Sequence, residues 1–221
     1  MPASRNHIVD PAIADYVVAH STPPDDVQER LMEVTQERTG RAAGMQIGGD
    51  QGTLFEILTR AMGATSAIEI GTFTGYSALA IARGLAEGGR LICCDVSDEW
   101  TSIGREYWEQ AGVADRIDLR LGPALETLGE LPADLTFDLA FVDADKVSYE
   151  AYVDALVPRL RPGGVILVDN TLWSGRVLDD DAADADSAAL RAFNDAVIAR
   201  DDVRVVILPI GDGVTVLQRR A

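Results

Sequence analysis

The sequence predicts an α/β fold with a doubly wound, mostly parallel seven-stranded sheet. Apolar segments typical of strands alternate with amphipathic segments typical of helices from residue 66 onward. This alternation is the pattern of a parallel sheet covered by helices. The last two apolar segments are joined by only five residues, Pro209 to Gly213, which favours a C-terminal antiparallel hairpin over a crossover.

The spacing of apolar residues places each element along the chain. Helices are predicted at residues 10–20, 25–38, 51–62, 76–85, 99–111, 124–128, 149–160 and 190–199. Strands are predicted at residues 67–70, 91–94, 117–121, 139–142, 165–168, 203–208 and 214–218. A glycine-rich stretch at 40–49 is expected to be a loop. With no linker or repeat, we expect one domain, in which residues 1–63 form a helical cap and residues 64–221 form the core.

The composition argues against nucleic-acid-binding and membrane-spanning proteins. The 221 residues are 47% hydrophobic, enough for a sizeable core, and carry a net charge of −17. Such an acidic chain is a poor partner for nucleic acid, because phosphate backbones are bound by Lys and Arg clusters. No run of eighteen apolar residues or apolar leader is present, so we expect no membrane span and a cytoplasmic location. Adjacent Cys93 and Cys94 would point to opposite faces of a strand, and we expect both to be buried and reduced.

Oxygen-bearing side chains follow two neighbouring predicted strands. Asp143 ends one apolar run, and Asp169 and Asn170 end the next. Parallel strands joined by a helix end at the same edge of a sheet, so these side chains should converge. Three oxygen ligands suit Mg²⁺, and Mn²⁺ or Ca²⁺ would also be accepted. The alternative is that the aspartates cap helices.

A glycine turn follows the first predicted strand. Gly71 and Gly75 would let the backbone approach a ligand and turn into a helix, or would simply serve strand–helix packing. Asp95, at the end of the second strand, is placed to accept hydrogen bonds from ribose hydroxyls or to cap the next helix. Glu69 would repel a pyrophosphate but suits an ammonium group, which favours S-adenosylmethionine over NAD. Gly122-Pro123-Ala124 would lie along the adenine ring.

Together these segments resemble the metal-dependent class I O-methyltransferases, the group that includes the caffeoyl-CoA and catechol enzymes. The matching stretches are residues 67–77, 141–146, 160–164, 168–170, 172–175 and 208–213. The resemblance implies metal ligands at Asp143, Asp169 and Asn170, and a catalytic lysine at Lys146, with Asp143 assisting. It also implies cofactor contacts at Met45, Glu69, Gly71, Ser77, Asp95, Ala124 and Asp143.

For the acceptor, the resemblance implies a small catechol-type aromatic molecule that contacts Trp173, Arg176 and Asp212. It further implies a homodimer. An acidic stretch, Asp179 to Asp186, reads as a solvated loop that leads into a helix and would repel a polyanionic CoA ester. The alternative for Lys146 is an ion pair with Asp145 or a position on the surface. Trp100 and Trp108 are expected to pack on a helix face.

Coordination of both vicinal oxygens by a cation would stabilise a phenolate, whose hydroxyl otherwise has a pKa of about 10. Lys146 would take the remaining proton, and alignment with the methyl sulfonium can supply roughly 7–11 kcal/mol of the barrier. Two other hypotheses remain: a non-catalytic S-adenosylmethionine-binding sensor or partner protein, and an NAD-type oxidoreductase, which lacks the GxGxxG signature.

Overall fold

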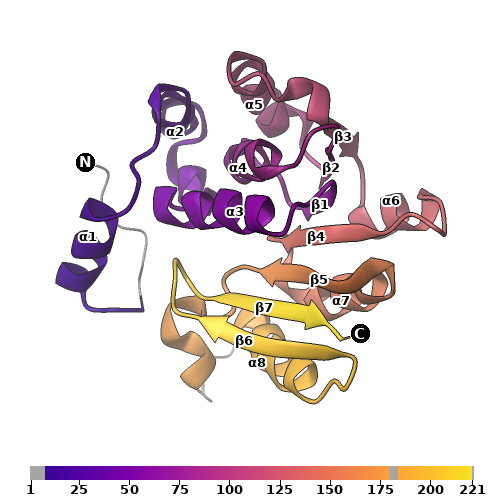
Figure 1. Ribbon diagram of the computed structural model, residues 1–221. Helices are drawn as coiled ribbons and strands as arrows, with labels where there is room; N and C mark the ends of the chain where they lie inside the picture. Colours follow the sequence, from indigo (N-terminus) through magenta and orange to yellow (C-terminus); the bar gives the residue numbers. More distant parts are fainter. Residues whose placement is uncertain (1–7, 180–183, 221) are drawn as a thin grey trace.

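A seven-stranded sheet forms the centre of the computed structural model, which describes residues 8–179 and 184–220. Its strands are β1 (Ser66–Ile70), β2 (Arg90–Asp95), β3 (Ile117–Leu121), β4 (Phe137–Val142), β5 (Leu160–Val168), β6 (Val203–Leu208) and β7 (Val214–Arg219). The strand order is β3-β2-β1-β4-β5-β7-β6 (Figure 1). Strands β1 to β5 run parallel, whereas β7 is antiparallel to both β5 and β6. The predicted fold class is confirmed, including the C-terminal hairpin.

The register brings the carboxyl ends of three strands to one level. Ile70 pairs with Val142, and Val142 pairs with Val168. The ladder continues one residue further, because the amide of Asp143 donates to Ile70 O at 2.8 Å and that of Asp169 donates to Val142 O at 3.0 Å. Strand order reverses between β1 and β4, and open parallel sheets bind ligands at such a switch point.

Helices cover both faces of the sheet (Figure 1). They are α1 (Pro11–Ala19), α2 (Asp26–Thr39), α3 (Gly49–Ala61), α4 (Tyr76–Gly84), α5 (Asp98–Gln110), α6 (Ala124–Glu130), α7 (Tyr149–Leu156) and α8 (Ala185–Ile198). The side chains of β4 alternate between two cores: Leu139 and Phe141 pack with α2 to α5, and Ala140 and Val142 pack with α6 to α8. This alternation follows from the two-residue period of a strand.

The main differences from the predicted bounds lie in three regions. β5 begins at Leu160, because α7 ends at Leu156 and a 3₁₀ turn containing Pro158 follows it. The expected loop at 40–49 contains a 3₁₀ helix, η1 (Gly40–Met45). α8 begins five residues before the predicted position, since Asp184 accepts a hydrogen bond from the Ser187 amide at 3.0 Å and caps it.

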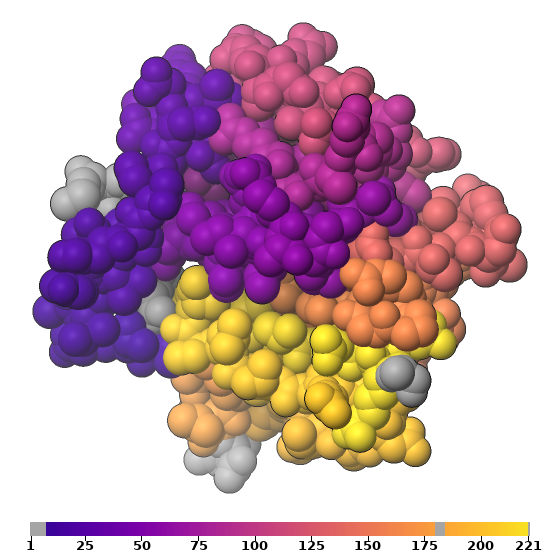
Figure 2. All heavy atoms as spheres, in the orientation of Figure 1, coloured from indigo at the N-terminus to yellow at the C-terminus, as the bar shows by residue number. Residues whose placement is uncertain are grey.

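The N-terminal segment lies along one side of the molecule, shown in indigo in Figure 2. α2 begins with a capping box, in which Asp25 and Gln28 satisfy each other's backbone amides. On α1, Ile13, Tyr16 and Val17 are exposed. Within the described parts of the chain, every helix is too short or too polar to cross a membrane.

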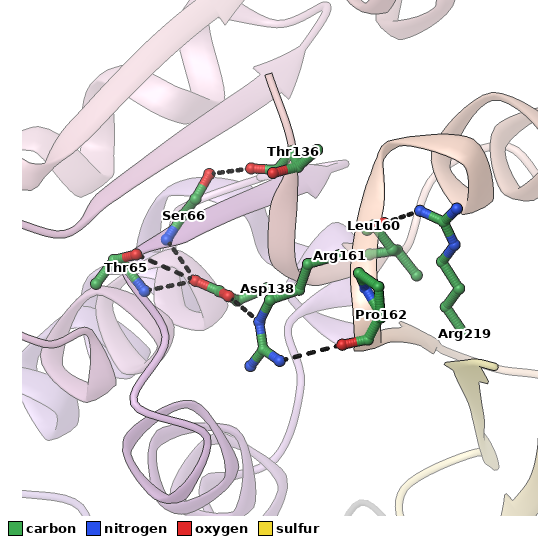
Figure 3. Close-up of polar contacts among 8 residues, drawn as sticks. All are labelled: Thr65, Ser66, Thr136, Asp138, Leu160, Arg161, Pro162 and Arg219. Carbon is green, nitrogen blue, oxygen red and sulfur yellow. Dashed lines mark hydrogen bonds and ion pairs between the residues drawn. The ribbon is translucent and has the colours of Figure 1, made fainter. Parts of the chain in front are cut away.

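Asp138 ties together three strands at the edge of the sheet opposite their carboxyl ends (Figure 3). Its Oδ2 accepts the amides of Thr65 at 2.7 Å and Ser66 at 3.0 Å, and its Oδ1 accepts from Arg161 on β5. Burial opposes ionisation, but these bonds outweigh it and hold the pKa of Asp138 below its usual value.

We predict that Asp138→Ala lowers the free energy of unfolding by about 2–4 kcal/mol, because two backbone amides and one guanidinium lose their acceptor. Urea denaturation at pH 7 measures this loss. The matched control is Asp118→Ala on β3, whose pair with Arg120 is half exposed and worth at most about 1 kcal/mol. Equal losses in the two variants would contradict the structural role of Asp138.

Candidate active site

A large cavity, with a volume of about 1320 Å³, opens at the carboxyl edge of the sheet. Its walls come from the segments that follow β1 to β5 and from residues 44–51, at the start of α3. The cavity therefore lies at the switch point that the topology identifies as a ligand site.

Nearly all the predicted site residues line this cavity. The lining includes Met45, Gly71, Ser77, Asp95, Ala124, Asp143, Lys146, Asp169, Asn170, Trp173, Arg176 and Asp212. Glu69 does not line it. The structure thus brings together residues from distant parts of the chain, and their individual roles remain predictions.

Gly71 and Gly75 shape the turn between β1 and α4. Their φ angles are +89° and +80°, in the region that favours glycine. A Cβ at Gly71 would collide with the carbonyl oxygen of Asp143, and one at Gly75 would collide with Trp108. Trp108 packs on this turn, as the predicted packing role requires, and its Nε1 donates to Gly75 O at 3.0 Å. The Asp143 backbone at Gly71 and the Trp108 indole at Gly75 therefore leave no room for a side chain at either position.

Asp95 holds the same turn from the neighbouring strand. Its Oδ2 accepts the amides of Thr72 at 2.9 Å and Phe73 at 2.8 Å, and its Oδ1 accepts the amide of Ser97 at 2.8 Å. The N-cap of α5 is Ser97, so the alternative reading of Asp95 as that cap is wrong. Asp95 is only partly buried and lines the cavity, which leaves its carboxylate accessible to a ligand.

Glu69 lies behind the turn and is fully buried. Burial raises its pKa to about 7, although the neighbouring polar side chains of Ser77, Thr72 and Cys93 partly offset this effect. The Cys93 thiol is 3.5 Å from Glu69 Oε2. Both cysteines are free and buried, as predicted.

Lys146 connects the ends of β4 and β5. Its ammonium donates to Asp143 Oδ1 at 2.9 Å, to Asn170 Oδ1 at 2.7 Å and to the Tyr149 hydroxyl at 2.6 Å. Its side chain is only 10% exposed. The pairing is with Asp143 rather than Asp145, so Lys146 is neither a surface lysine nor a partner of Asp145.

Asp169 lies beside this group and is 3% exposed. Burial, and next the charge of Asp143, raise the pKa of Asp169 to about 7. Its Oδ1 accepts the amide of Asn170 at 2.8 Å, and Tyr149 OH donates to its backbone carbonyl at 3.1 Å. Neither Asp143 nor Asp169 caps a helix, since the N-caps of the following turns are Asp145 and Leu172.

The oxygens of this cluster suit a cation. Asp143 Oδ1 and Asn170 Oδ1 already converge on one positive charge, the Lys146 ammonium. A second carboxylate, Asp169, is buried next to them and is destabilised by the charge of Asp143. A divalent cation would relieve that repulsion. Within residues 8–179 and 184–220, no three His, Cys, Asp or Glu side chains form a metal-binding group, so the predicted set depends on the Asn170 carboxamide.

Four non-glycine residues of the described chain have positive φ: Phe73, Asn170, Trp173 and Ser174. All four line the cavity. This conformation costs free energy for most residues and is typical of functional sites. The concentration of such residues around one cavity therefore supports its assignment as the active site.

The β6–β7 turn fixes the segment after β5. Thr171 and Leu172 donate their amides to the carbonyls of Gly213 and Asp212, both at 3.0 Å, and Ser174 donates its amide to Asp212 Oδ1. Asp212 thus shapes the loop that carries Trp173. Arg176 pairs with Asp184. Asp179, Asp184 and Asp186 of the acidic stretch are described, whereas residues 180–183 lie outside the described chain.

The sequence analysis did not assign Trp100 and Gln51 to the site, although both line the cavity. Trp100, expected to pack on a helix face, lines the cavity and meets Phe73 edge-on with ring centres 5.1 Å apart. Gln51 is 1% exposed, lies next to Gly211, and its side chain lowers the pKa of Asp169. A polar residue inside a predicted apolar helix face is the signal that would have drawn attention to Gln51.

Known proteins resemble this chain over nearly its whole length. A family model described as O-methyltransferase matches residues 18–220. Caffeoyl-CoA O-methyltransferase 2 of Zea mays is 40% identical over 206 residues, covering 89% of this chain and 77% of the relative. Tricin synthase 1 of Oryza sativa is 42% identical over 188 residues, covering 79% and 75%.

Solved structures show the same architecture. An O-methyltransferase from Bacillus cereus in complex with SAH has a TM-score of 0.84 at 30% identity, covering 94% of this chain and 97% of that one. TomG from Streptomyces achromogenes, solved with SAM, has a TM-score of 0.85 at 27% identity and covers 100% of both chains.

We predict that Glu69 makes stability fall as pH rises. Its folded pKa, about 7, exceeds the value of about 4.3 expected for an unfolded chain, so the folded state binds the proton more tightly between these values. Stability due to this group is therefore lost as pH rises from about 4 to 7. Glu69→Gln should gain stability relative to the natural chain across this window, as followed by thermal denaturation at fixed salt. If the difference in stability between Glu69→Gln and the natural chain did not change with pH, the prediction that Glu69 is buried and protonated would be contradicted.

Proposed function

The chain belongs to the O-methyltransferase family, and on this premise we propose that it transfers the methyl group of S-adenosylmethionine to one hydroxyl of a catechol-type aromatic, with the help of a divalent cation. The observation that carries the proposal is the convergence of Asp143, Lys146, Asp169 and Asn170 on one wall of the cavity. The names of the maize relative and of a mouse catechol O-methyltransferase domain-containing protein, 43% identical over 169 residues, point to phenolic acceptors.

S-adenosylmethionine, which carries its methyl group on a positively charged sulfur, would bind in the part of the cavity next to the glycine turn. Gly71 and Gly75 allow the backbone to approach the ligand, and Asp95 has acceptor capacity left for ribose hydroxyls. Met45, Ser77 and Ala124 form further parts of this wall. Glu69 would act from behind the turn, through Ser77 and Thr72.

Asp143, Asp169 and Asn170 would hold the cation, with Mg²⁺ the first choice and Mn²⁺ or Ca²⁺ also suited to oxygen ligands. A cation there would lower the pKa of the acceptor hydroxyls. Lys146 Nζ faces the same oxygens, and in its neutral form it would take the proton that the acceptor loses. Tyr149, hydrogen-bonded to Lys146 at 2.6 Å, would hold that amine in place.

Trp173 and Arg176 would form the part of the wall that contacts the acceptor. Lys146 Nζ is 5.7 Å from the centre of the Trp173 ring, so a planar acceptor next to Lys146 would also contact this indole. Asp212 would act by fixing the Trp173 loop through the Ser174 amide. Ordered walls of this kind would keep the two reacting atoms in line, and such positioning can supply a large part of a rate gain.

The proposal includes a one-domain homodimer in the cytoplasm, without nucleic-acid or membrane partners. The two free cysteines suit a reducing compartment. The exposed apolar side chains of α1 offer a surface for a second copy.

We predict metal-dependent transfer of label from methyl-labelled S-adenosylmethionine to a panel of catechols. Asp169→Asn should lower kcat/KM by about 100-fold or more, since even loss of groups that only support ligands costs 10–100-fold. EDTA should abolish transfer, and added Mg²⁺ should restore it. The matched control is Asp118→Asn, on the surface of β3, which should keep full activity.

Transfer that survives both EDTA and Asp169→Asn would contradict the metal mechanism and leave the methyltransferase assignment intact. Absence of transfer to every catechol, with cofactor binding retained, would favour the non-catalytic alternative.

A further inference from the structure

The cavity walls carry a strongly negative charge. Six aspartates line it: Asp95, Asp143, Asp145, Asp169, Asp186 and Asp212. Among the described lining residues the cations are Lys146 and Arg176. Even a divalent metal and the sulfonium of the cofactor would leave this cavity without surplus positive charge.

Both lining cations already face carboxylates. Lys146 Nζ lies 2.9 Å from Asp143 Oδ1, on side chains that are 10% and 16% exposed. Arg176, which lines the cavity, pairs with Asp184. Hydrogen bonds from Ser187, with the charge of Arg176 as a smaller contribution, keep the pKa of Asp184 below its usual value. The three acceptors around Lys146 Nζ leave it no donor for a phosphate, and Arg176 would have to share its guanidinium between a phosphate and the Asp184 carboxylate.

Carboxylates also lie near the proposed acceptor wall. Asp186 and Asp212 lie there with Trp173, and Asp179 follows on the same loop. Phosphates in proteins are bound by Arg forks, Lys ammonium groups or glycine-rich helix starts. α8 begins next to this region, but its first turn carries Asp186 and its cap is Asp184, so its start presents carboxylates to a ligand.

We propose that the acceptor is a neutral or positively charged catechol and that a CoA thioester is strongly disfavoured. This inference rests on the proposed function and specifies its substrate class. The diphosphate and 3′-phosphate of CoA would approach a wall of aspartates, where repulsion lowers the rate of productive encounter. A catechol amine would be concentrated by the same field, and the Trp173 ring would accept the planar aromatic ring in either case.

The test compares acceptors with the same ring and different charge. Methyl caffeate is neutral, caffeoyl-CoA is polyanionic, and dopamine is a cationic catechol. We expect kcat/KM for methyl caffeate and dopamine to exceed that for caffeoyl-CoA by at least about tenfold at low ionic strength. Added salt should shrink the difference, since it screens exposed charges.

Variants with altered charge test whether the negative cavity wall is what disfavours caffeoyl-CoA. Asp186→Lys should raise kcat/KM for caffeoyl-CoA relative to methyl caffeate by about threefold or more. Glu109→Lys makes the same charge change at an exposed position of α5 outside the cavity lining, and it should leave that ratio unchanged. Melting temperatures of both variants check that they fold.

A kcat/KM for caffeoyl-CoA equal to or above that for methyl caffeate would overturn the inference and leave the proposed O-methyl transfer intact. An equal shift in both lysine variants would overturn the role assigned to the cavity charge. No transfer to any of the three catechols would overturn the proposed function itself.

Discussion

The alignment of β1, β4 and β5 at their carboxyl ends is the constraint on which the site depends. Parallel pairing carries the ladder from Ile70 and Val142 into Asp143 and Asp169, so the two carboxylates leave the sheet at adjacent positions. The glycine turn follows from the same alignment, because the Asp143 carbonyl lies so close to Gly71 that no side chain fits. The Lys146 ammonium then joins both strand ends through Asp143 and Asn170. Strand register therefore sets the geometry of the glycine turn and of the cluster around Lys146 at the same time.

The electrostatics of the site work against stability. Glu69 and Asp169 are both buried, and burial raises the pKa of each to about 7. Four residues with strained backbone line the same cavity. A cation among the oxygens and a positively charged cofactor would offset this cost on binding. Under the proposed function, the cost of the site in the free protein would be relieved when its ligands bind.

Much of this arrangement was predictable from residues near each other in the chain. Strand-end positions identified Asp143, Asp169 and Asn170, because the edge at which a parallel strand ends follows from topology. Contacts between distant segments were not predictable in the same way. Gln51 meets Asp169 only because the start of α3 reaches the cavity, and Asp95 binds the glycine turn through amides that carry no sequence signal. The early start of β5 was missed because Pro162, Gly163 and Gly164 indicate a turn locally, whereas pairing with β4 extends the strand.

The account depends most on the cluster at Asp143, Asp169 and Asn170 being a cation site. Binding of Mn²⁺, followed by electron paramagnetic resonance of the free ion, measures this directly and without turnover. The account predicts one site per chain, which Asn170→Leu weakens by at least about tenfold, while Gln110→Leu, at an exposed position of α5 outside the cavity lining, leaves it unchanged. Binding of equal strength in the natural chain and in Asn170→Leu would contradict it.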